Sequence, residues 1–188
     1  MAKKYLRLGL IGSIALLSGC ASMDQGQCVT AEWLEQGRKD GTQGTQMQHY
    51  KEYQSDCSKY GVSVNTAEYK KGWQEGIRQY CTRDNGWAVG IRGGTYRHSC
   101  PSNLESTFYS AYQTARNIHT KRSEIDRLSN EIEGLGDKLA SSDLTAEKRK
   151  ELKAKRKDKK SEKSRLQFSL TTLQSEAKKM GFPAANLY

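Results

Sequence analysis

Five cysteines constrain the possible folds of this chain more than any other feature of its sequence. Cys20 directly follows an apolar stretch, whereas the other four are spread through polar sequence, at Cys28, Cys57, Cys81 and Cys100. An even set of cysteines in an oxidising compartment predicts disulfides. Whether these four form two bridges therefore depends on whether the chain is exported.

The N-terminus has the composition of an export signal. Lys3, Lys4 and Arg7 are followed by residues 8–17, which carry no charge. A basic segment followed by an apolar stretch of this length is typical of a signal peptide. It is too short for a membrane-spanning helix, which needs about 20 apolar residues. We therefore expect the chain to be exported.

The apolar stretch ends in Leu-Ser-Gly-Cys at residues 17–20, which resembles the lipobox of bacterial lipoproteins. The resemblance implies that the Cys20 thiol is acylated and that residues 1–19 are cleaved off, which leaves residues 20–27 as a lipid-anchored linker. No Asp follows Cys20, which favours the inner leaflet of the outer membrane, facing the periplasm. The alternative is a soluble secreted protein with an unrelated cysteine near its cleavage site.

In an oxidising periplasm the four remaining cysteines predict two disulfides, for which three pairings exist. We favour Cys28–Cys57 with Cys81–Cys100, because each bridge then closes one local unit and contributes about 2–4 kcal/mol. A zinc site of four thiolates is the alternative, but the sequence has no C-x₂-C spacing. We expect no metal and no cofactor.

Two helices are predicted to begin at Thr30 and Thr66, each of which opens a Thr-Ala-Glu-aromatic segment as its N-cap. Small residues spaced four apart follow both segments and recur in a weaker third copy. They are Gly37, Gly41, Gly72, Gly76, Ala111 and Ala115. Since a glycine inside a helix costs about 1 kcal/mol relative to alanine, these residues indicate close packing of one backbone on another.

Residues 85–100 predict a short β-hairpin. Trp87, Val89 and Ile91 alternate with small or polar residues, as in a strand with one buried face. The Gly-Gly pair at residues 93–94 is a favourable two-residue turn.

A longer series of aromatic, glycine and cysteine residues follows a definite order along the chain. It comprises Trp33, Gly37, Gly41, Gly44, His49, Cys57, Tyr69, Gly72, Gly76, Tyr80, Cys81, Asn85, Gly86, Gly90, Gly93, Tyr96, Cys100 and Pro101. This order, over residues 28–119, resembles the DUF2799 family of bacterial envelope lipoproteins. The resemblance implies an envelope location and a type of fold but no activity, because the family's function is unknown. Ala111 and Ala115 depart from the family, whose members tend to carry glycine there.

Apolar residues spaced by seven predict an antiparallel helical hairpin over residues 118–181. The first arm has Ile or Leu at positions 118, 125, 132 and 139, and the second has Leu or Met at 152, 166, 173 and 180. This is the seam of a coiled coil, and arms of about 36 residues would be about 54 Å long. Lys159 occupies the missing step, which leaves open an intramolecular hairpin or a dimer. Residues 182–188 form a tail.

The positive charge of the chain is concentrated in the second arm. The whole chain carries +10, and residues 144–165 contain eleven Lys or Arg against four acids. We predict a basic face that comprises Lys148, Lys155, Arg156, Lys159, Lys160 and Lys163. It is either a solvated face partly neutralised by the first arm, or a face that binds anionic lipid, peptidoglycan or an envelope protein. Nucleic acid is excluded by export and by the lack of aromatic residues within the basic run.

The sequence contains no enzyme motif. His49, His98 and His119 each lack a second histidine or acid at metal-ligand spacing, and no G-x-S-x-G, P-loop or H-E-x-x-H pattern is present. Bridged cysteines supply no thiolate for Cys–His chemistry. We therefore predict no catalysis. The alternative is a small-ligand binder or hydrolase that uses the glycine-lined face near His49, Tyr80 and Tyr96.

These features predict a mainly α-helical protein. A small disulfide-stapled domain rich in glycine and aromatic residues, with one short β-hairpin, spans residues 28–117, and the basic helical hairpin follows over residues 118–181. We expect a structural or adaptor lipoprotein of the bacterial cell envelope.

Overall fold

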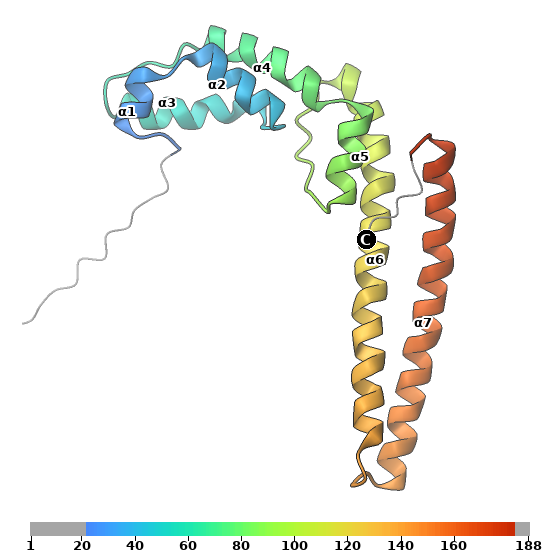
Figure 1. The fold of residues 1–188 in the computed structure, drawn as a ribbon. Coiled ribbons are helices and arrows are strands. Elements are labelled where there is room, and N and C mark those ends of the chain that lie inside the picture. The colour runs from blue at the N-terminus through green and yellow to red at the C-terminus, as the bar shows by residue number, and fades with distance from the viewer. Residues whose placement is uncertain (1–21, 183–188) are drawn as a thin grey trace, which may run out of the picture.

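The computed structural model describes residues 22–182, and every regular element in that range is a helix. The bounds are α1 Gln25–Thr30, α2 Trp33–Thr42, a 3₁₀ turn η1 Met47–His49, α3 Tyr50–Ser58, α4 Thr66–Tyr80, α5 Arg83–Ile91, α6 Ser102–Ala140 and α7 Ala146–Lys179. Helices α1 to α4 form one lobe of the molecule, and α6 with α7 forms the long hairpin, which lies at an angle to that lobe (Figure 1). The mainly helical prediction is confirmed. No helix within the described range is both long and apolar enough to cross a membrane.

Backbone contact between α2 and α4 holds the lobe of α1 to α4 together. A Cβ atom on Gly72 would lie 1.8 Å from the carbonyl oxygen of Leu34, and one on Gly37 would lie 2.0 Å from the carbonyl oxygen of Tyr69. The second glycine of each helix meets the opposite backbone in the same way. The glycines therefore bring two helices into contact, as the packing interpretation predicts. Because the opposite helix fills this glycine face, it leaves no room for a ligand groove.

The β-hairpin predicted for residues 85–100 is wrong, because α5 occupies the first half of that segment. Thr82 caps the start of α5 by accepting a backbone hydrogen bond. Gly86 and Gly90 lie four residues apart on the face that meets α6, where a Cβ atom on Gly86 would lie 2.3 Å from a carbonyl oxygen. Gly93, expected in a hairpin turn, has φ +75° and follows the helix end instead.

The two glycine-packed helix pairs are copies of one structural unit. Unit 1 (residues 28–80) packs α2 on α4, and unit 2 (residues 81–119) packs α5 on α6. In both units, a Gly-x₃-Gly-x₂-Gly segment starts in the first helix and ends just after it, and its first two glycines meet the part of the second helix that carries an aromatic residue and two small residues. The corresponding sets are Gly37, Gly41, Gly44, Tyr69, Gly72 and Gly76 in unit 1, and Gly86, Gly90, Gly93, Phe108, Ala111 and Ala115 in unit 2.

The two disulfides occupy the same place in both units. Cys28–Cys57 and Cys81–Cys100 each join the segment before the first helix of a unit to the segment before its second helix. The favoured pairing is confirmed. Each bridge closes one unit, so the chain consists of two stapled copies in series.

The helix starts predicted at Thr30 and Thr66 are both displaced. Helix α1 ends at Thr30, and α2 begins at Trp33 without a side-chain cap. Asn65 caps α4 by accepting a hydrogen bond from the Glu68 N–H (3.2 Å), so Thr66 is the first helical residue. The Thr-Ala-Glu repeat therefore relates α2 to α4. These two helices pack on each other within unit 1 and do not correspond to unit 1 and unit 2.

Helix α6 belongs both to unit 2 and to the helical hairpin. It has 39 residues, which gives a length of about 58 Å at 1.5 Å per residue, and it crosses the domain boundary predicted at residue 117 without a break. Helix α7 packs antiparallel beside it (Figure 1), which confirms the hairpin.

The buried residues of the seam include Ile118, Leu128, Leu135, Leu152 and Ala177. At the base of the hairpin, Phe182 stacks on Trp87 of α5 (ring centroids 4.3 Å apart). Residues 183–188 of the predicted tail lie outside the described residues.

The glycine contacts predict a position-specific loss of stability. Gly72→Ala should lower the free energy of unfolding by about 3 kcal/mol, because the new methyl group has to push the Leu34 backbone away. The matched control is Gly134→Ala in α6, where nothing lies within 4 Å of the added Cβ atom; it should raise stability by up to about 1 kcal/mol. Urea unfolding with the disulfides intact measures both. Similar values for the two variants would contradict the packing described here.

Candidate functional site

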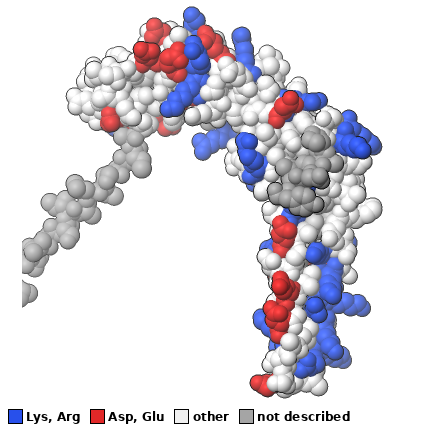
Figure 2. Space-filling view, in the orientation of Figure 1, with Lys and Arg blue, Asp and Glu red and all other residues white. Residues whose placement is uncertain are grey.

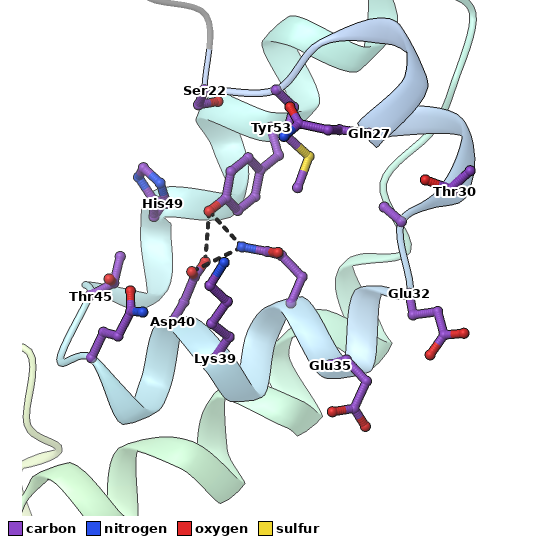
Figure 3. A pocket seen from close by; sticks show the side chains of 14 residues that line it. Ser22, Gln27, Thr30, Glu32, Glu35, Lys39, Asp40, Thr45, His49 and Tyr53 are labelled. Carbon is purple, nitrogen blue, oxygen red and sulfur yellow. Dashed lines mark hydrogen bonds between the residues drawn. The ribbon is translucent and has the colours of Figure 1, made fainter.

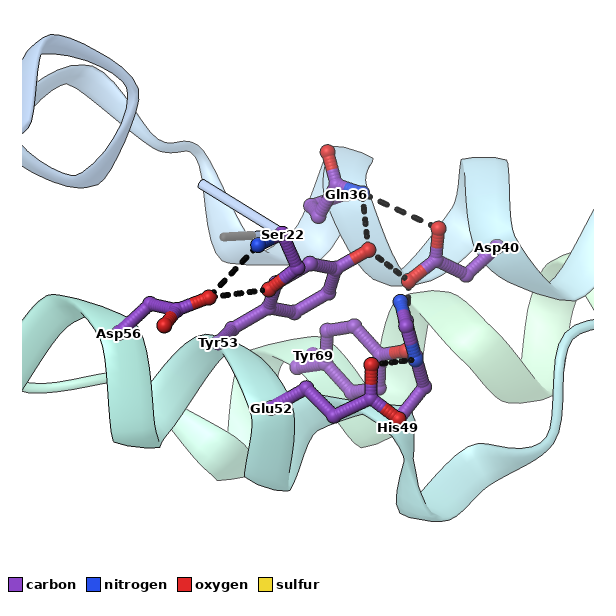
Figure 4. Close-up of polar contacts among 8 residues, drawn as sticks. All are labelled: Ser22, Gln36, Asp40, His49, Glu52, Tyr53, Asp56 and Tyr69. Carbon is purple, nitrogen blue, oxygen red and sulfur yellow. Dashed lines mark hydrogen bonds and ion pairs between the residues drawn. The ribbon is translucent and has the colours of Figure 1, made fainter. Parts of the chain in front are cut away.

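Cys20, the predicted lipid carrier, lies outside the described residues, and the chain is held to α3 almost directly after it. Ser22 donates its backbone N–H (2.7 Å) and its hydroxyl (2.8 Å) to Asp56 Oδ2 (Figure 4), and Lys59 Nζ donates to Oδ1 (2.7 Å). The hydrogen bonds from Lys59 and Ser22 hold the pKa of Asp56 well below its usual value. This ionised carboxylate therefore fixes the start of the described chain to unit 1.

A buried carboxylate connects the helices of unit 1. Asp40 is 4% exposed, and its Oδ2 accepts hydrogen bonds from the hydroxyls of Tyr69 (2.7 Å) and Tyr53 (3.0 Å). Its Oδ1 accepts one from Gln36 Nε2 (3.0 Å), which also donates to the Tyr53 hydroxyl (Figure 4). Burial, together with the neighbouring Asp40, raises the pKa of both phenols above their ordinary value. Both phenols therefore remain hydrogen-bond donors at neutral pH.

Unit 2 has apolar residues at the corresponding positions. Val89 precedes Gly90 as Asp40 precedes Gly41, and Phe108 corresponds to Tyr69. A buried carboxylate is costly unless it is hydrogen-bonded, and unit 2 packs the same helix pair without one. The Asp40 network is therefore an addition particular to unit 1. The sequence prediction missed it, although aligning the two Gly-x₃-Gly-x₂-Gly segments would have placed this acid opposite a valine.

An open cleft of about 740 Å³ lies beside this network (Figure 3). Gln36, Asp40 and Tyr53 line it, and Glu32 and Glu35 add two further carboxylates. The remaining lining residues are Ser22, Met23, Gln27, Thr30, Ala31, Lys39, Gln43, Thr45 and His49. Amide, hydroxyl and carboxylate groups in such numbers can bind polar molecules. No group of three His, Cys, Asp or Glu residues within residues 22–182 is placed to hold a metal ion.

The three residues of the alternative site are divided between two places. His49 Nδ1 lies 3.1 Å from a carboxylate oxygen of Glu52 in unit 1, at the edge of the cleft. Tyr80 and Tyr96 both pack on Phe108, with ring centroids 5.1 Å and 4.6 Å away. Burial is the main cause that raises the pKa of Tyr96 to about 12. The two tyrosines are thus part of the aromatic core and are packed on one ring.

The predicted basic face of the hairpin divides into exposed and half-buried residues. The exposed ones are Lys148, Lys155 and Lys160, and the half-buried ones are Arg156, Lys159 and Lys163. Lys159 Nζ lies 3.0 Å from a carboxylate oxygen of Glu131 in α6, so the residue that interrupts the apolar spacing joins the two arms within one chain. Figure 2 shows Lys and Arg gathered along one side of the hairpin and acidic residues along the other. The exposed cations of the predicted face all lie on α7.

Residues 32–117 match the model of the family DUF2799, which is described as a protein of unknown function. The matched range begins at the N-cap of α2 and ends within α6, so it covers the glycine-packed helices of both units and excludes most of the hairpin. No curated protein and no solved structure matches the chain.

The Asp40 network predicts strong coupling between two substitutions. Asp40→Val alone should cost about 3 kcal/mol, because it leaves two buried phenols without their acceptor, and Tyr69→Phe alone about 2 kcal/mol. The double variant reproduces the residues of unit 2, and its cost should fall below the sum of the two by about 1 kcal/mol or more. Urea unfolding of the four proteins measures this coupling. Tyr60→Phe on the surface serves as the control, and strictly additive effects would show that the two groups do not act as a unit.

Proposed function

Residues 32–117 of the chain belong to the DUF2799 family, whose function is unknown, and we propose that the protein is a lipid-anchored adaptor of the bacterial cell envelope. In this proposal, acylated Cys20 holds the protein at the inner leaflet of the outer membrane. The two units face the periplasm, and the basic hairpin contacts a second component of the envelope, which is a protein, peptidoglycan or anionic lipid.

The course of α6 is the observation that carries this proposal. The helix begins inside unit 2 and ends at Ala140, and Figure 1 shows that this end forms the tip of the hairpin, remote from α1. Unit 1 also contacts α6, since Tyr80 at the end of α4 stacks on Phe108. The cations of α7 lie beside the far half of this continuous helix, where they are suited to contact with a distant surface.

The N-terminal sequence supports the anchored end of the adaptor. The segment that resembles a lipobox ends at Cys20, and Ser22 is already hydrogen-bonded to Asp56 of α3. Several acyl chains on one cysteine hold a protein firmly at a membrane, at about 0.8 kcal/mol for each buried CH₂ group. With so short a connection, unit 1 would lie close to the lipid surface.

We propose no catalytic step. Three hydrogen-bond donors already engage the Asp40 carboxylate, and both disulfides leave their cysteines without a thiolate. The cleft of unit 1 offers groups for binding, whereas a reaction needs a nucleophile within reach of a base.

A photoreactive amino acid at position 155 tests the adaptor in cells. Lys155 is exposed on α7, and we expect illumination to attach a discrete envelope component to the otherwise unaltered protein. The Cys20→Ser chain should lose fatty-acid labelling, leave the membrane fraction and give less of the same adduct. Mass spectrometry of the adduct identifies the component.

Lys51, which is exposed on α3 of unit 1, provides the matched control position. Adducts that are the same from positions 51 and 155 would contradict a specific role of the hairpin. A Cys20→Ser chain that stays acylated and membrane-bound would contradict the anchor.

A further inference from the structure

A second cleft lies near the tip of the hairpin, with a volume of about 410 Å³. Its lining consists of one apolar side chain and five cations, without an acid. The residues are Leu139, Arg149, Lys153, Arg156, Lys157 and Lys160. All five cations come from α7, and like charges four residues apart on a helix destabilise it. The helix carries this repulsion along the face that borders the cleft.

Both arginines contact α6, and Arg149 is also hydrogen-bonded to the end of that helix. Arg149 donates from Nη1 to the Leu139 carbonyl (2.7 Å) and from Nη2 to the Ser141 carbonyl (2.9 Å), which covers the C-terminal end of α6. The guanidinium of Arg156 lies against Gly136, where a Cβ atom would be 3.3 Å from Nη2. A glycine within a helix costs about 1 kcal/mol, and here it makes room for the guanidinium.

Four positive groups of the cleft lack a partner among the described residues. The Nε of Arg156 is buried and has no hydrogen-bond acceptor among the described residues. Lys153, Lys157 and Lys160 form no ion pair with an acid of residues 22–182, whereas the nearby Lys148 and Lys159 do. The cleft thus combines a fixed guanidinium with free ammonium groups above an apolar floor.

We propose that this cleft binds a phosphate group that carries at least two negative charges. A planar guanidinium and compact ammonium groups suit a phosphate with several oxygens better than a single carboxylate. The volume admits a group of the size of pyrophosphate or a phosphorylated lipid headgroup. This inference rests on the proposed function for its biological setting, but the binding itself needs neither the anchor nor a membrane.

Calorimetric titration of the Cys20→Ser chain with inorganic pyrophosphate tests the cleft. We expect saturable binding at one site that weakens as salt is added. Lys153→Gln with Lys157→Gln should weaken it at least tenfold. Lys178→Gln with Lys179→Gln removes the same charge from exposed residues at the other end of α7 and should change affinity less than twofold. Arg156→Lys keeps the charge and should still weaken binding about fivefold, because it removes the guanidinium.

Vesicles distinguish the sources of the phosphate. If vesicles of phosphatidylcholine with phosphatidic acid capture the protein and pyrophosphate releases it, the ligand is a lipid headgroup; if they do not, it is a soluble phosphate. Equal weakening by the two double variants, indifference to Arg156→Lys, or no saturable binding would overturn the cleft as a site. The crosslinking experiment at position 155 would still test whether the hairpin contacts an envelope component, so either proposal can fail without the other.

Discussion

The direct contact of helix backbones at small residues is the constraint on which the rest of this structure depends. In unit 1 the glycines of α2 and α4 lie against the opposite backbone, and in unit 2 Gly86 and Gly90 lie against α6. Helices this close bury little side-chain surface at their crossing. Stability therefore comes from the surrounding aromatic rings and from one disulfide per unit. The apolar side chains of the two stapled units form one shared core, which includes Trp33, Ile77 and Phe108.

The two copies have diverged where the packing leaves freedom to do so. Unit 1 buries Asp40 beneath an open polar cleft, whereas unit 2 has Val89 there and extends its second helix into the hairpin. Binding chemistry is thus divided between two places. A polar cleft lined in part by Ser22 lies in unit 1, and a basic cleft lies at the C-terminal end of α6.

Much of this arrangement is readable in the sequence. The cysteines left three pairings open, and the one favoured because each bridge closes a local unit is the one observed. The seven-residue spacing predicted the hairpin, and the glycine spacing predicted backbone contact. Helix α5 was missed, because the alternating apolar residues 87–91 fit a strand as well as a short helix. The spacing of Gly86 and Gly90 indicates a helix only once it is known that both glycines lie against α6. The Asp40 network and the role of Lys159 in the seam depend on partners distant in sequence, which no local pattern specifies.

Packed helices connect unit 1 to the hairpin and should hold the basic tip at a fixed place relative to Ser22. Spin labels on non-cysteine amino acids at Val29 and Ser142, both exposed, measure this most directly without disturbing the disulfides. We expect one narrow distribution of distances between the labels in the full-length protein. A broad distribution, or several populations, would instead show that the hairpin moves independently of the units.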